Sequence, residues 1–193
     1  MTGIIILAAG ASSRMGSAKQ NLLYRGQTLL QAAISKALQC DCEIVSVVLG
    51  ANAAEIVPTL IGLPIKTFFN ERWKDGMGSS IAYGVKELLI IHPNLDSVLF
   101  LLTDQPFISA DHINKLIEHR QQGQIVTSAY NNTLGPPILF DKVYFSELME
   151  IKGSEGAKKL INKYLNKVLP YPFEAGAFDV DTPEDYERLA GKY

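Results

Sequence analysis

The chain has 193 residues, the size of one ordinary domain, and we expect a single domain over residues 1–193. Its 47% hydrophobic and 20% charged residues are typical of a globular protein and exclude intrinsic disorder, collagen-like repeats and coiled coils. The net charge of −2 argues against a protein that binds nucleic acid or an anionic membrane through bulk charge.

Short aliphatic and β-branched runs alternate with longer amphipathic segments up to residue 129. Strands are predicted at residues 3–8, 43–49, 65–69, 97–102 and 124–129. Helices are predicted between them at residues 28–39, 53–60, 79–91 and 109–121, with Thr28 and Ser109 as N-caps. This alternation predicts a three-layer α/β/α fold of the Rossmann-like kind, with a mainly parallel sheet covered on both faces.

The regular alternation ends after residue 129. Residues 131–137 have a turn-rich composition that predicts a loop, and helices are predicted near 141–149 and 154–164. A last strand is predicted near 177–180, followed by a helix that Thr182 caps. Ligands of open α/β sheets bind beyond the carboxyl ends of the strands, so the loops that follow the strands are where we expect the site.

The loop after the first predicted strand has the chemistry of a triphosphate cradle. Small residues, which let backbone N–H groups approach an anion, are followed by two cations, Arg14 and Lys19, without any acid. The nucleotide-binding candidates here are Leu7, Ala8, Ala9, Gly10, Ala11 and Ser12, together with the two cations. The spacing is neither a Walker A loop nor a G-x-G-x-x-G fingerprint. A surface loop with two solvated cations is the alternative that we consider less favoured.

A second glycine-rich loop precedes the helix predicted at residues 79–91. It contains the only tryptophan, Trp73, and the four candidate nucleotide-binding residues Gly76, Gly78, Ser79 and Ser80. Ser79 or Ser80 is expected to cap the helix while free N–H groups at its start face a ligand. On spacing alone, a capped helix with tryptophan as a surface anchor explains the segment equally well.

Acidic residues follow two further predicted strands. Asp104 comes after the apolar run 97–102, where a carboxylate is costly unless a cation such as Mg²⁺ compensates it. The alternative is that it accepts from turn amides before Pro106. Asp179 and Asp181 stand two apart in an extended segment, so both face one side, and a nearby cation relieves their repulsion. Alternatively, Asp181 only helps to start the last helix and Asp179 is merely exposed.

The remaining histidines and cysteines give no signal of a site. His92, His112 and His119 show neither a triad partner nor metal spacing and are predicted to be solvated. Cys40 and Cys42 form neither a disulfide framework nor a zinc motif. The first residues lack a basic leader and a membrane-spanning length, so we expect a cytoplasmic protein.

These motifs resemble those of a known family. Residues 7–19 resemble the L-A-A-G-x-S-x-R-M-G-x-x-K signature of nucleotidyltransferases, and residues 19–30 resemble its molybdenum cofactor cytidylyltransferase branch. The segments N-x-x-W-x-x-G-M-G-S-S at 70–80, D-Q-P at 104–106 and D-x-D-T-P-E-D at 179–185 resemble the same family. The sequence departs from the branch pattern at Ala18, Asn21 and Leu23.

The resemblance assigns expected roles to the candidate residues. It implies that Arg14 and Lys19 bind the phosphates of the nucleotide and act in catalysis, together with Asp104. It implies that Asp104 is the first ligand of Mg²⁺ or Mn²⁺ and that Asp181, favoured over Asp179, is the second. The loop at residues 76–80 is then expected to contact the base and the ribose.

The resemblance also implies a reaction: transfer of CMP from CTP to the phosphate of molybdopterin, with release of pyrophosphate. CTP is favoured over GTP by Ala9, where guanylyl relatives tend to have glycine. We expect a nucleotide-binding half at about residues 1–108 and an acceptor-binding half at about 109–193, with a molybdoenzyme or its maturation chaperone as partner. A sugar or polyol phosphate as acceptor and a non-catalytic, cofactor-binding maturation factor stay open as alternatives.

Overall fold

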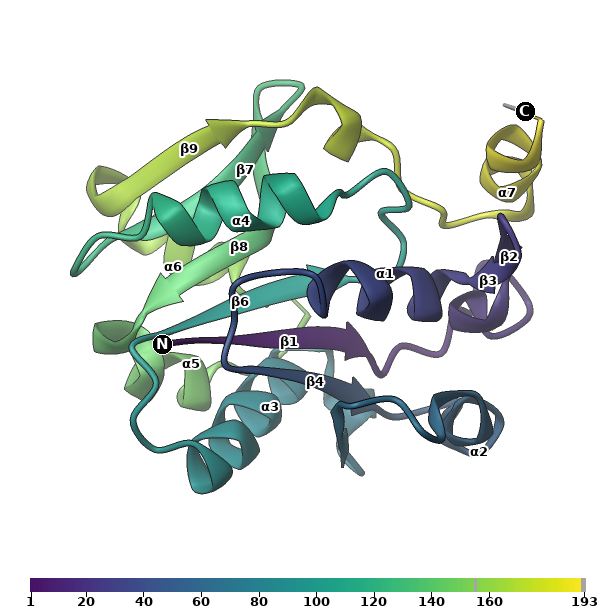
Figure 1. The fold of residues 1–193 in the computed structure, drawn as a ribbon, viewed down its shortest axis with the longest axis horizontal. Coiled ribbons are helices and arrows are strands. Elements are labelled where there is room, and N and C mark those ends of the chain that lie inside the picture. The colour runs from purple at the N-terminus through teal and green to yellow at the C-terminus, as the bar shows by residue number, and fades with distance from the viewer. Residues whose placement is uncertain (155, 192–193) are drawn as a thin grey trace.

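The computed structural model describes residues 1–154 and 156–191. Within these residues, a seven-stranded sheet with the order β5-β4-β1-β6-β8-β7-β9 forms the centre of the molecule (Figure 1). Its strands are β1 (Thr2–Ala8), β4 (Ile44–Leu49), β5 (Lys66–Phe69), β6 (Ser97–Leu102), β7 (Ile125–Tyr130), β8 (Thr133–Asp141) and β9 (Val168–Pro172). All pairings are parallel except those of β8, which runs antiparallel to β6 and β7. The predicted, mainly parallel sheet is confirmed.

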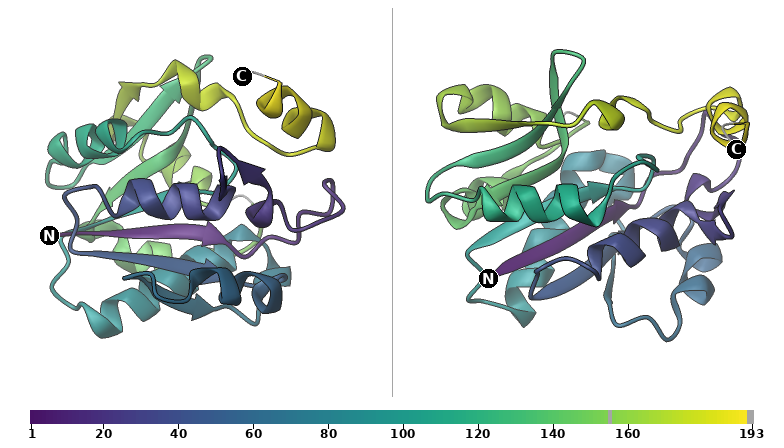
Figure 2. Two further views of the ribbon diagram at one scale, coloured as in Figure 1. Left: turned by 45° about the vertical axis from the view of Figure 1, so that its right-hand side comes forward. Right: turned by 45° about the horizontal axis from the view of Figure 1, so that its top comes forward.

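Helices cover both faces of the sheet (Figures 1 and 2). One face carries α1 (Leu29–Ala37), α2 (Ala53–Ile56) and α4 (Ala110–Glu118), and the other carries α3 (Met77–Ile91), α5 (Phe145–Glu150) and α6 (Lys158–Lys163). Ile4 and Ile6 of β1 belong to the core under the first set, whereas Ile5 belongs to the core under the second. Side chains alternate between the faces of a strand, so a continuously apolar strand supplies both cores and the three-layer fold is confirmed.

Short 3₁₀ helices lie between some of these strands and helices. They are η1 (Lys19–Asn21), η2 (Val57–Leu60), η3 (Trp73–Asp75), η4 (Lys142–Tyr144), η5 (Leu165–Lys167) and η6 (Glu174–Ala177). None of the described helices is both long and apolar enough to cross a membrane.

The strands after residue 130 differ from the prediction. The predicted loop at residues 131–137 belongs mostly to β8, because only Asn131 and Asn132, with φ of 47° and 57°, make the turn of a β7–β8 hairpin. The two prolines inside β8 are accommodated beside a register shift at Thr127 and Ser128, since proline removes a ladder hydrogen bond and is tolerated at irregular pairings.

The strand predicted near residues 177–180 is wrong. This region contains the end of η6 and an irregular segment, and the additional strand is β9, at the edge of the sheet. The sequence pattern did not predict β9 because it contains Pro170 and Pro172. Proline normally argues against a strand and is tolerated at the edge of a sheet.

The last helix returns to the beginning of the chain. Helix α7 (Pro183–Ala190) lies beside a small hairpin of β2 (Leu23–Tyr24) and β3 (Gln27–Thr28), which the sequence analysis did not predict (Figure 2). The Tyr186 hydroxyl donates a hydrogen bond of 2.7 Å to the Leu23 carbonyl. This contact brings residues just before α7 to the loop after β1.

The predicted helix caps are mostly present. Thr28 and Thr182 form capping boxes at α1 and α7, and the Ser109 side chain accepts from His112 N at the start of α4. These residues satisfy backbone N–H groups that a helix leaves unpaired in its first turn.

His112 is buried, which corrects the prediction of a solvated side chain. Only 5% of its surface is exposed, its Nε2 lies 2.8 Å from Ser128 Oγ, and its ring stacks on Phe173 with centroids 3.9 Å apart. Because desolvation disfavours the imidazolium, burial lowers the pKa of His112 to about 4. The prediction failed because Phe173, which covers this face of α4, is distant in sequence.

Candidate active site

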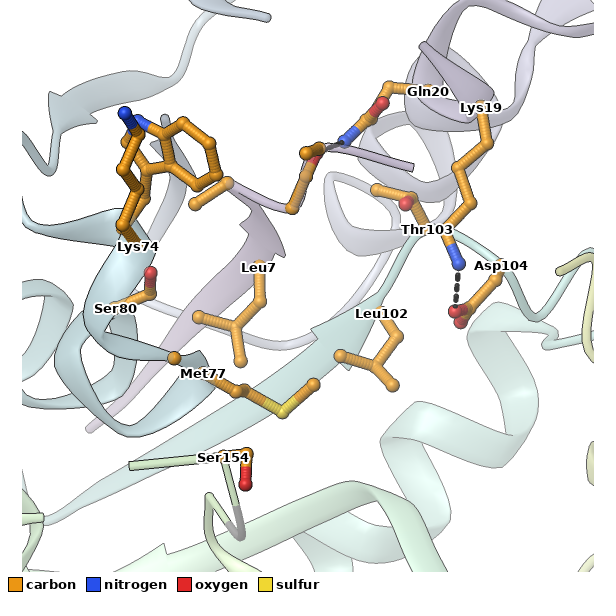
Figure 3. A pocket seen from close by; sticks show the side chains of 15 residues that line it. Leu7, Lys19, Gln20, Lys74, Met77, Ser80, Leu102, Thr103, Asp104 and Ser154 are labelled. Atoms are coloured by element: carbon orange, nitrogen blue, oxygen red, sulfur yellow. Dashed lines mark hydrogen bonds and ion pairs between the residues drawn. The ribbon is translucent and has the colours of Figure 1, made fainter. Parts of the chain in front are cut away.

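A cavity of about 390 Å³ lies at the carboxyl ends of β1 and β6, where an open α/β sheet places its ligands (Figure 3). Its walls come from the loop after β1, the start of α3 and the loop after β6. The side chains labelled in Figure 3 are Leu7, Lys19, Gln20, Lys74, Met77, Ser80, Leu102, Thr103, Asp104 and Ser154. Three separately predicted loops therefore meet at one cavity.

Hydrogen bonds from its own residues and from η1 fix the shape of the loop after β1. Gln20, which is buried, donates from Nε2 to the carbonyls of Ala8 and Gly10 at 3.0 Å each. The Ser12 hydroxyl accepts from the backbone N–H of Lys19 at 3.2 Å. Of the candidates in this loop, Leu7, Ala9, Gly10, Ala11 and Lys19 line the cavity. Ala8 is buried in β1, and Ser12 instead supports the shape of the loop.

The start of α3 is built differently from the prediction. The N-cap is Gly76 and makes no side-chain cap hydrogen bond, so the prediction of Ser79 or Ser80 as the cap is wrong. Asn70 instead donates from Nδ2 to the hydroxyls of Ser79 and Ser80, at 3.0 Å each. Ser79 Oγ in turn donates to carbonyls, among them that of Gly76 at 2.8 Å.

A close backbone approach explains the glycines of this loop. Gly78 N donates to the Gly153 carbonyl at 2.9 Å, and a Cβ on Gly76 would stand 2.6 Å from Gly153 C and O. Gly76 and Ser80 line the cavity, whereas Gly78 and Ser79 are not among its lining residues. Of the half of the chain predicted to bind the acceptor, Ser154 is the described residue that lines this cavity.

Sequence reasoning missed several residues that shape the site. Gln20 and Asn70 received no role of their own, although both are buried polar side chains that hold the two loops. Met77 and Ser154 lie in segments with an expected role but were not named as site residues. A polar residue next to a phosphate-binding motif is the signal that was available for Gln20. The contact of Ser154 with the cavity has no local signal, because it depends on packing between distant segments.

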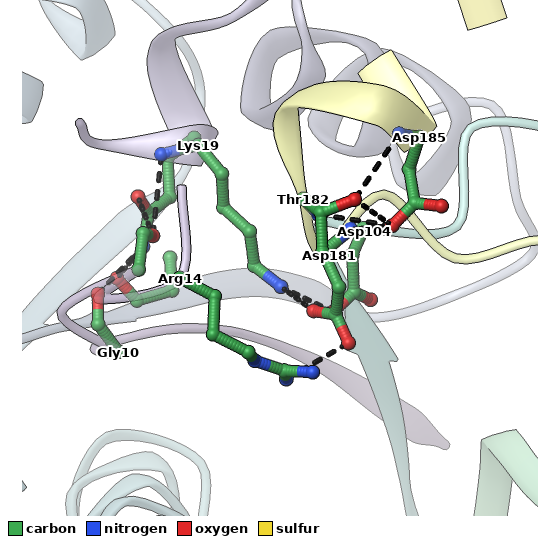
Figure 4. A network of polar contacts seen from close by, with 10 residues as sticks. Gly10, Arg14, Lys19, Asp104, Asp181, Thr182 and Asp185 are labelled. Atoms are coloured by element: carbon green, nitrogen blue, oxygen red, sulfur yellow. Dashed lines mark hydrogen bonds and ion pairs between the residues drawn. The ribbon is translucent and has the colours of Figure 1, made fainter. Parts of the chain in front are cut away.

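A network of charged side chains stands beside the cavity (Figure 4). Lys19 Nζ donates to Asp104 Oδ2 at 2.7 Å and to Asp181 Oδ1 at 2.8 Å, and Arg14 Nη2 donates to Asp181 Oδ2 at 2.9 Å. The Lys19 and Asp104 side chains are only 17% and 15% exposed, whereas Arg14 is 71% exposed. The four residues predicted from three separate motifs are thus brought together.

Two backbone N–H groups, those of Val180 and Asp181, position the second acidic segment. Val180 N donates to the Asp104 carbonyl at 2.9 Å, and Asp181 N donates to Asp185 Oδ2 at 3.1 Å. The second of these contacts ties Asp181 to the capped start of α7. The position of Asp181 beside Lys19 therefore depends on where α7 docks.

The network favours the charged forms of Lys19 and Asp181. Burial by itself lowers the pKa of Lys19, but the charge of Asp104 and hydrogen bonds to both aspartates outweigh it and raise that pKa. Burial likewise raises the pKa of Asp181, yet the hydrogen bonds and positive charges of Lys19 and Arg14 together outweigh it and lower that pKa. Asp179 makes none of these ion pairs but stands near enough to feel their charges, and partial burial of its carboxyl followed by the charge of Asp104 raises its pKa to about 6.

The donor set suits a hard divalent cation. Asp104 Oδ1 is buried and has no hydrogen-bond partner within the described residues, while Asp104 and Asp181 converge on one point, the Lys19 ammonium. No cluster of three or more His, Cys, Asp and Glu side chains occurs in the described part of the chain. Two carboxylates fit Mg²⁺ or Mn²⁺, because magnesium in proteins usually takes one or two carboxylates and completes its shell with phosphate oxygens and water.

Comparisons with known proteins show which proteins this chain is similar to. The family model of the MobA-like NTP transferase domain matches residues 4–168. The chain is 31% identical over 197 residues to the purine catabolism protein PucB of Bacillus subtilis (strain 168), covering 96% of this chain and 94% of that protein. It is 31% identical over 200 residues to nicotine blue oxidoreductase of Paenarthrobacter nicotinovorans, covering 98% and 96%. These names differ, so they do not by themselves assign a reaction.

A solved structure with the same fold covers nearly the whole chain. The crystal structure of Rv0371c from Mycobacterium tuberculosis H37Rv has a TM-score of 0.86 and 26% identity, covering 99% of this chain and 98% of that one. A manganese complex of the same protein has a TM-score of 0.82 and 25% identity, covering 100% and 99%.

Proposed function

Because this chain belongs to the MobA-like NTP transferase family and is therefore a nucleotidyltransferase, we propose that it transfers CMP from CTP to the phosphate of molybdopterin, releasing pyrophosphate. The observation that carries this proposal is the contact of Lys19 with Asp104 and Asp181 at the edge of a cavity walled by a phosphate-type loop. Such a site offers both cations for a triphosphate and carboxylates for its metal ion.

We assign the triphosphate to the loop after β1. Its exposed Gly10 and Ala11 bring backbone groups to the cavity without a large side chain. Arg14 in the middle of the loop and Lys19 at its end both contact Asp181. The base and the ribose then lie toward Trp73, Lys74 and Ser80 at the start of α3, which line the same cavity. Ala9 in the cavity wall supports CTP over GTP, in keeping with the family pattern.

In the proposed reaction an oxygen of the acceptor phosphate attacks the α-phosphorus of CTP. The new P–O bond forms as the bond between the α-phosphorus and the bridging oxygen breaks, and pyrophosphate leaves with that electron pair. Phosphoryl-type transfer depends mainly on positioning and charge stabilisation, so a Ser or Cys nucleophile is not needed. We assign Lys19 to the charge that grows at the α-phosphate and Arg14 to the leaving pyrophosphate.

We assign Asp104 and Asp181 as the residues that hold Mg²⁺ or Mn²⁺, which when bound supplies further neutralisation of the triphosphate charge. Asp179 stands outside the ion-pair network and is the less favoured ligand. The manganese complex of a relative with 25% identity supports a divalent cation in this fold.

The proposed acceptor is the phosphate group of molybdopterin. Molybdopterin is supported by the resemblance of the segments at residues 19–30, 70–80 and 104–106 to the cytidylyltransferase branch. We expect the acceptor at the cavity wall formed by Ser154, which belongs to the half of the chain assigned to the acceptor, next to Met77 of the nucleotide-binding half. A molybdoenzyme or its maturation chaperone is then the protein that receives the product.

A triphosphate-by-acceptor panel tests the proposal. Purified protein and Mg²⁺ are mixed with CTP, GTP, UTP or ATP, and with molybdenum-loaded molybdopterin, a sugar phosphate or a polyol phosphate, and pyrophosphate release is measured. We expect release with CTP and molybdopterin, and none with Asp104→Asn. Release only with a sugar or polyol phosphate would replace the acceptor, and nucleotide binding without release under any acceptor would identify a cofactor carrier.

A further inference from the structure

The two carboxylates beside the cavity already have counter-ions from their own chain. Lys19 Nζ lies 2.7 Å from Asp104 Oδ2 and 2.8 Å from Asp181 Oδ1, and Arg14 Nη2 lies 2.9 Å from Asp181 Oδ2. Three of the four carboxylate oxygens are therefore engaged. The fourth, Asp104 Oδ1, is buried and has no hydrogen-bond partner within the described residues.

The charges of this cluster cancel. Lys19 and Arg14 bring two positive charges to the two negative charges of Asp104 and Asp181. Because Lys19 and Asp104 are only 17% and 15% exposed, solvent and salt screen their attraction weakly. A divalent cation that approaches alone must compete with the Lys19 ammonium for the same oxygens, and the ammonium repels it.

A nucleoside triphosphate changes this balance. Its phosphate oxygens are strong acceptors for ammonium and guanidinium groups, so they offer Lys19 and Arg14 an equivalent partner. Once these cations have turned to the phosphates, both carboxylates are available to a metal ion, and the phosphates complete its shell.

We propose that Lys19 is a displaceable counter-ion, which keeps divalent metal off Asp104 and Asp181 until a nucleoside triphosphate arrives. Metal and nucleotide then bind with strong positive coupling, and Lys19 has carboxylate partners first and phosphate partners afterwards. This inference rests on the proposed function, since it takes the triphosphate as the ligand. It adds a second role for Lys19, in addition to charge stabilisation during transfer.

The test measures metal binding without nucleotide. Mn²⁺ alone is titrated with protein, and the loss of the electron paramagnetic resonance signal of free Mn²⁺ gives its Kd. Lys19→Met removes the ammonium and keeps an apolar side chain of similar length, so we expect it to bind Mn²⁺ about tenfold more tightly than the wild type. Equal Mn²⁺ affinities, at a site that Asp104→Asn abolishes, would overturn the inference.

Two variants serve as matched controls. Lys19→Arg keeps the positive charge and is expected to bind Mn²⁺ as weakly as the wild type. Lys74→Met removes a cation from the wall of the same cavity, where the ammonium lies over the Trp73 ring, and is expected to leave the affinity for Mn²⁺ unchanged. A gain as large in Lys74→Met as in Lys19→Met would show a general charge effect and would also overturn the inference.

The wild type gives a second readout that does not depend on any variant folding. Trp73 is the only tryptophan and lines the cavity, so its fluorescence reports CTP binding. Thermodynamic coupling is reciprocal, so Mn²⁺ must strengthen CTP binding by the same factor by which CTP strengthens Mn²⁺ binding, about tenfold or more. A CTP affinity that Mn²⁺ does not change would contradict the proposal.

The inference and the proposed function fail separately. Coupled binding of Mn²⁺ and CTP without CMP transfer to any acceptor refutes the function and leaves the role of Lys19 intact. CMP transfer by a protein whose Mn²⁺ affinity is independent of nucleotide and of Lys19 refutes only the inference.

Discussion

Lys19 is the residue on which the site depends most strongly, because it touches carboxylates from two segments that are 85 and 162 residues away in sequence. Its position at the start of η1 follows from the turn that Ser12 and Gln20 hold. Neither contact is local, so the effect of replacing Lys19 reports on the assembled site more than on the loop itself.

We expect Lys19→Ala to lower kcat by about a hundredfold, which corresponds to ~3 kcal/mol of transition-state stabilisation, with the fold intact. Steady-state pyrophosphate release measures the rate, and circular dichroism checks the fold. The matched control is Lys66→Ala, which removes an exposed lysine from β5, outside the cavity, and is expected to keep the rate. A nearly normal kcat for Lys19→Ala would refute its assigned role.

His112 makes stability depend on pH. Its pKa in the folded state is about 4, below the unfolded value near 6.5, so the unfolded chain binds more protons between these values. The contribution of His112 to the unfolding free energy is therefore present above pH 6.5 and is lost as the pH falls toward 4. We expect this residue alone to remove about 2 kcal/mol of unfolding free energy between pH 7 and pH 5.

Urea denaturation of the wild type and of His112→Phe at both pH values measures this contribution. The variant keeps an aromatic ring against Phe173 but cannot titrate, so its loss of stability between pH 7 and pH 5 is expected to be smaller by that amount. An identical pH dependence in the two proteins would mean that His112 does not contribute.

The start of α3 shows how one element depends on another. Gly76 has a φ of 99°, and a Cβ there would stand 2.6 Å from the backbone of Gly153. We expect Gly76→Ala to destabilise the fold by about 1–3 kcal/mol and to raise KM for the nucleotide, because the loop must move away from Gly153. Chemical denaturation and steady-state kinetics measure the two effects.

The control for Gly76 is Gly123, which has a φ of 73° but open space around an added Cβ. Gly123→Ala is expected to carry only the conformational cost of about 1 kcal/mol and to leave KM unchanged. Equal losses of stability in both variants, with an unchanged KM in each, would show that the approach to Gly153 does not matter.

Helix α7 connects stability to the site through its N-cap. Thr182→Ala removes the capping box, which we expect to cost about 1 kcal/mol of unfolding free energy. Because Asp181 donates to the same Asp185 carboxylate that closes this box, kcat is also expected to fall. Ser109→Ala, which uncaps α4, is expected to cost about as much stability without the loss of kcat. Equal kcat values in the two variants would show that the cap of α7 does not affect the site.

At the scale of the whole molecule, nucleotide and metal join segments from both ends of the chain. A ligand at about a hundred times its Kd adds about 2.7 kcal/mol to the stability of the folded state. For a chain of 193 residues this predicts a rise in Tm of about 5–10 °C with CTP and Mg²⁺ in a thermal-shift assay. Asp104→Asn is expected to lose the part of the rise that needs Mg²⁺. The assignment fails if Mg²⁺ adds nothing to the CTP-dependent rise in the wild type.

Much of this architecture was predictable because its signals are local. The apolar runs of β1, β4 and β6, the caps Thr28 and Thr182, and the small residues after β1 each act within a few positions along the chain. The family motifs likewise lie within short segments. From these, the α/β/α fold followed, and the nucleotidyltransferase family was expected from the resemblance and is shown by the family match.

The amino-acid sequence by itself thus determined the fold class and the family, and it singled out the charged residues of the candidate site. Only the tertiary structure decided that Arg14 and Lys19 pair with Asp181, that Gly76 rests on Gly153, and that β9 with its prolines closes the sheet. The physical reason is the distance along the chain over which each kind of interaction acts. Propensities, caps and periodicity act between neighbours in the chain, whereas ion pairs and close backbone approaches arise only after packing has brought distant segments together.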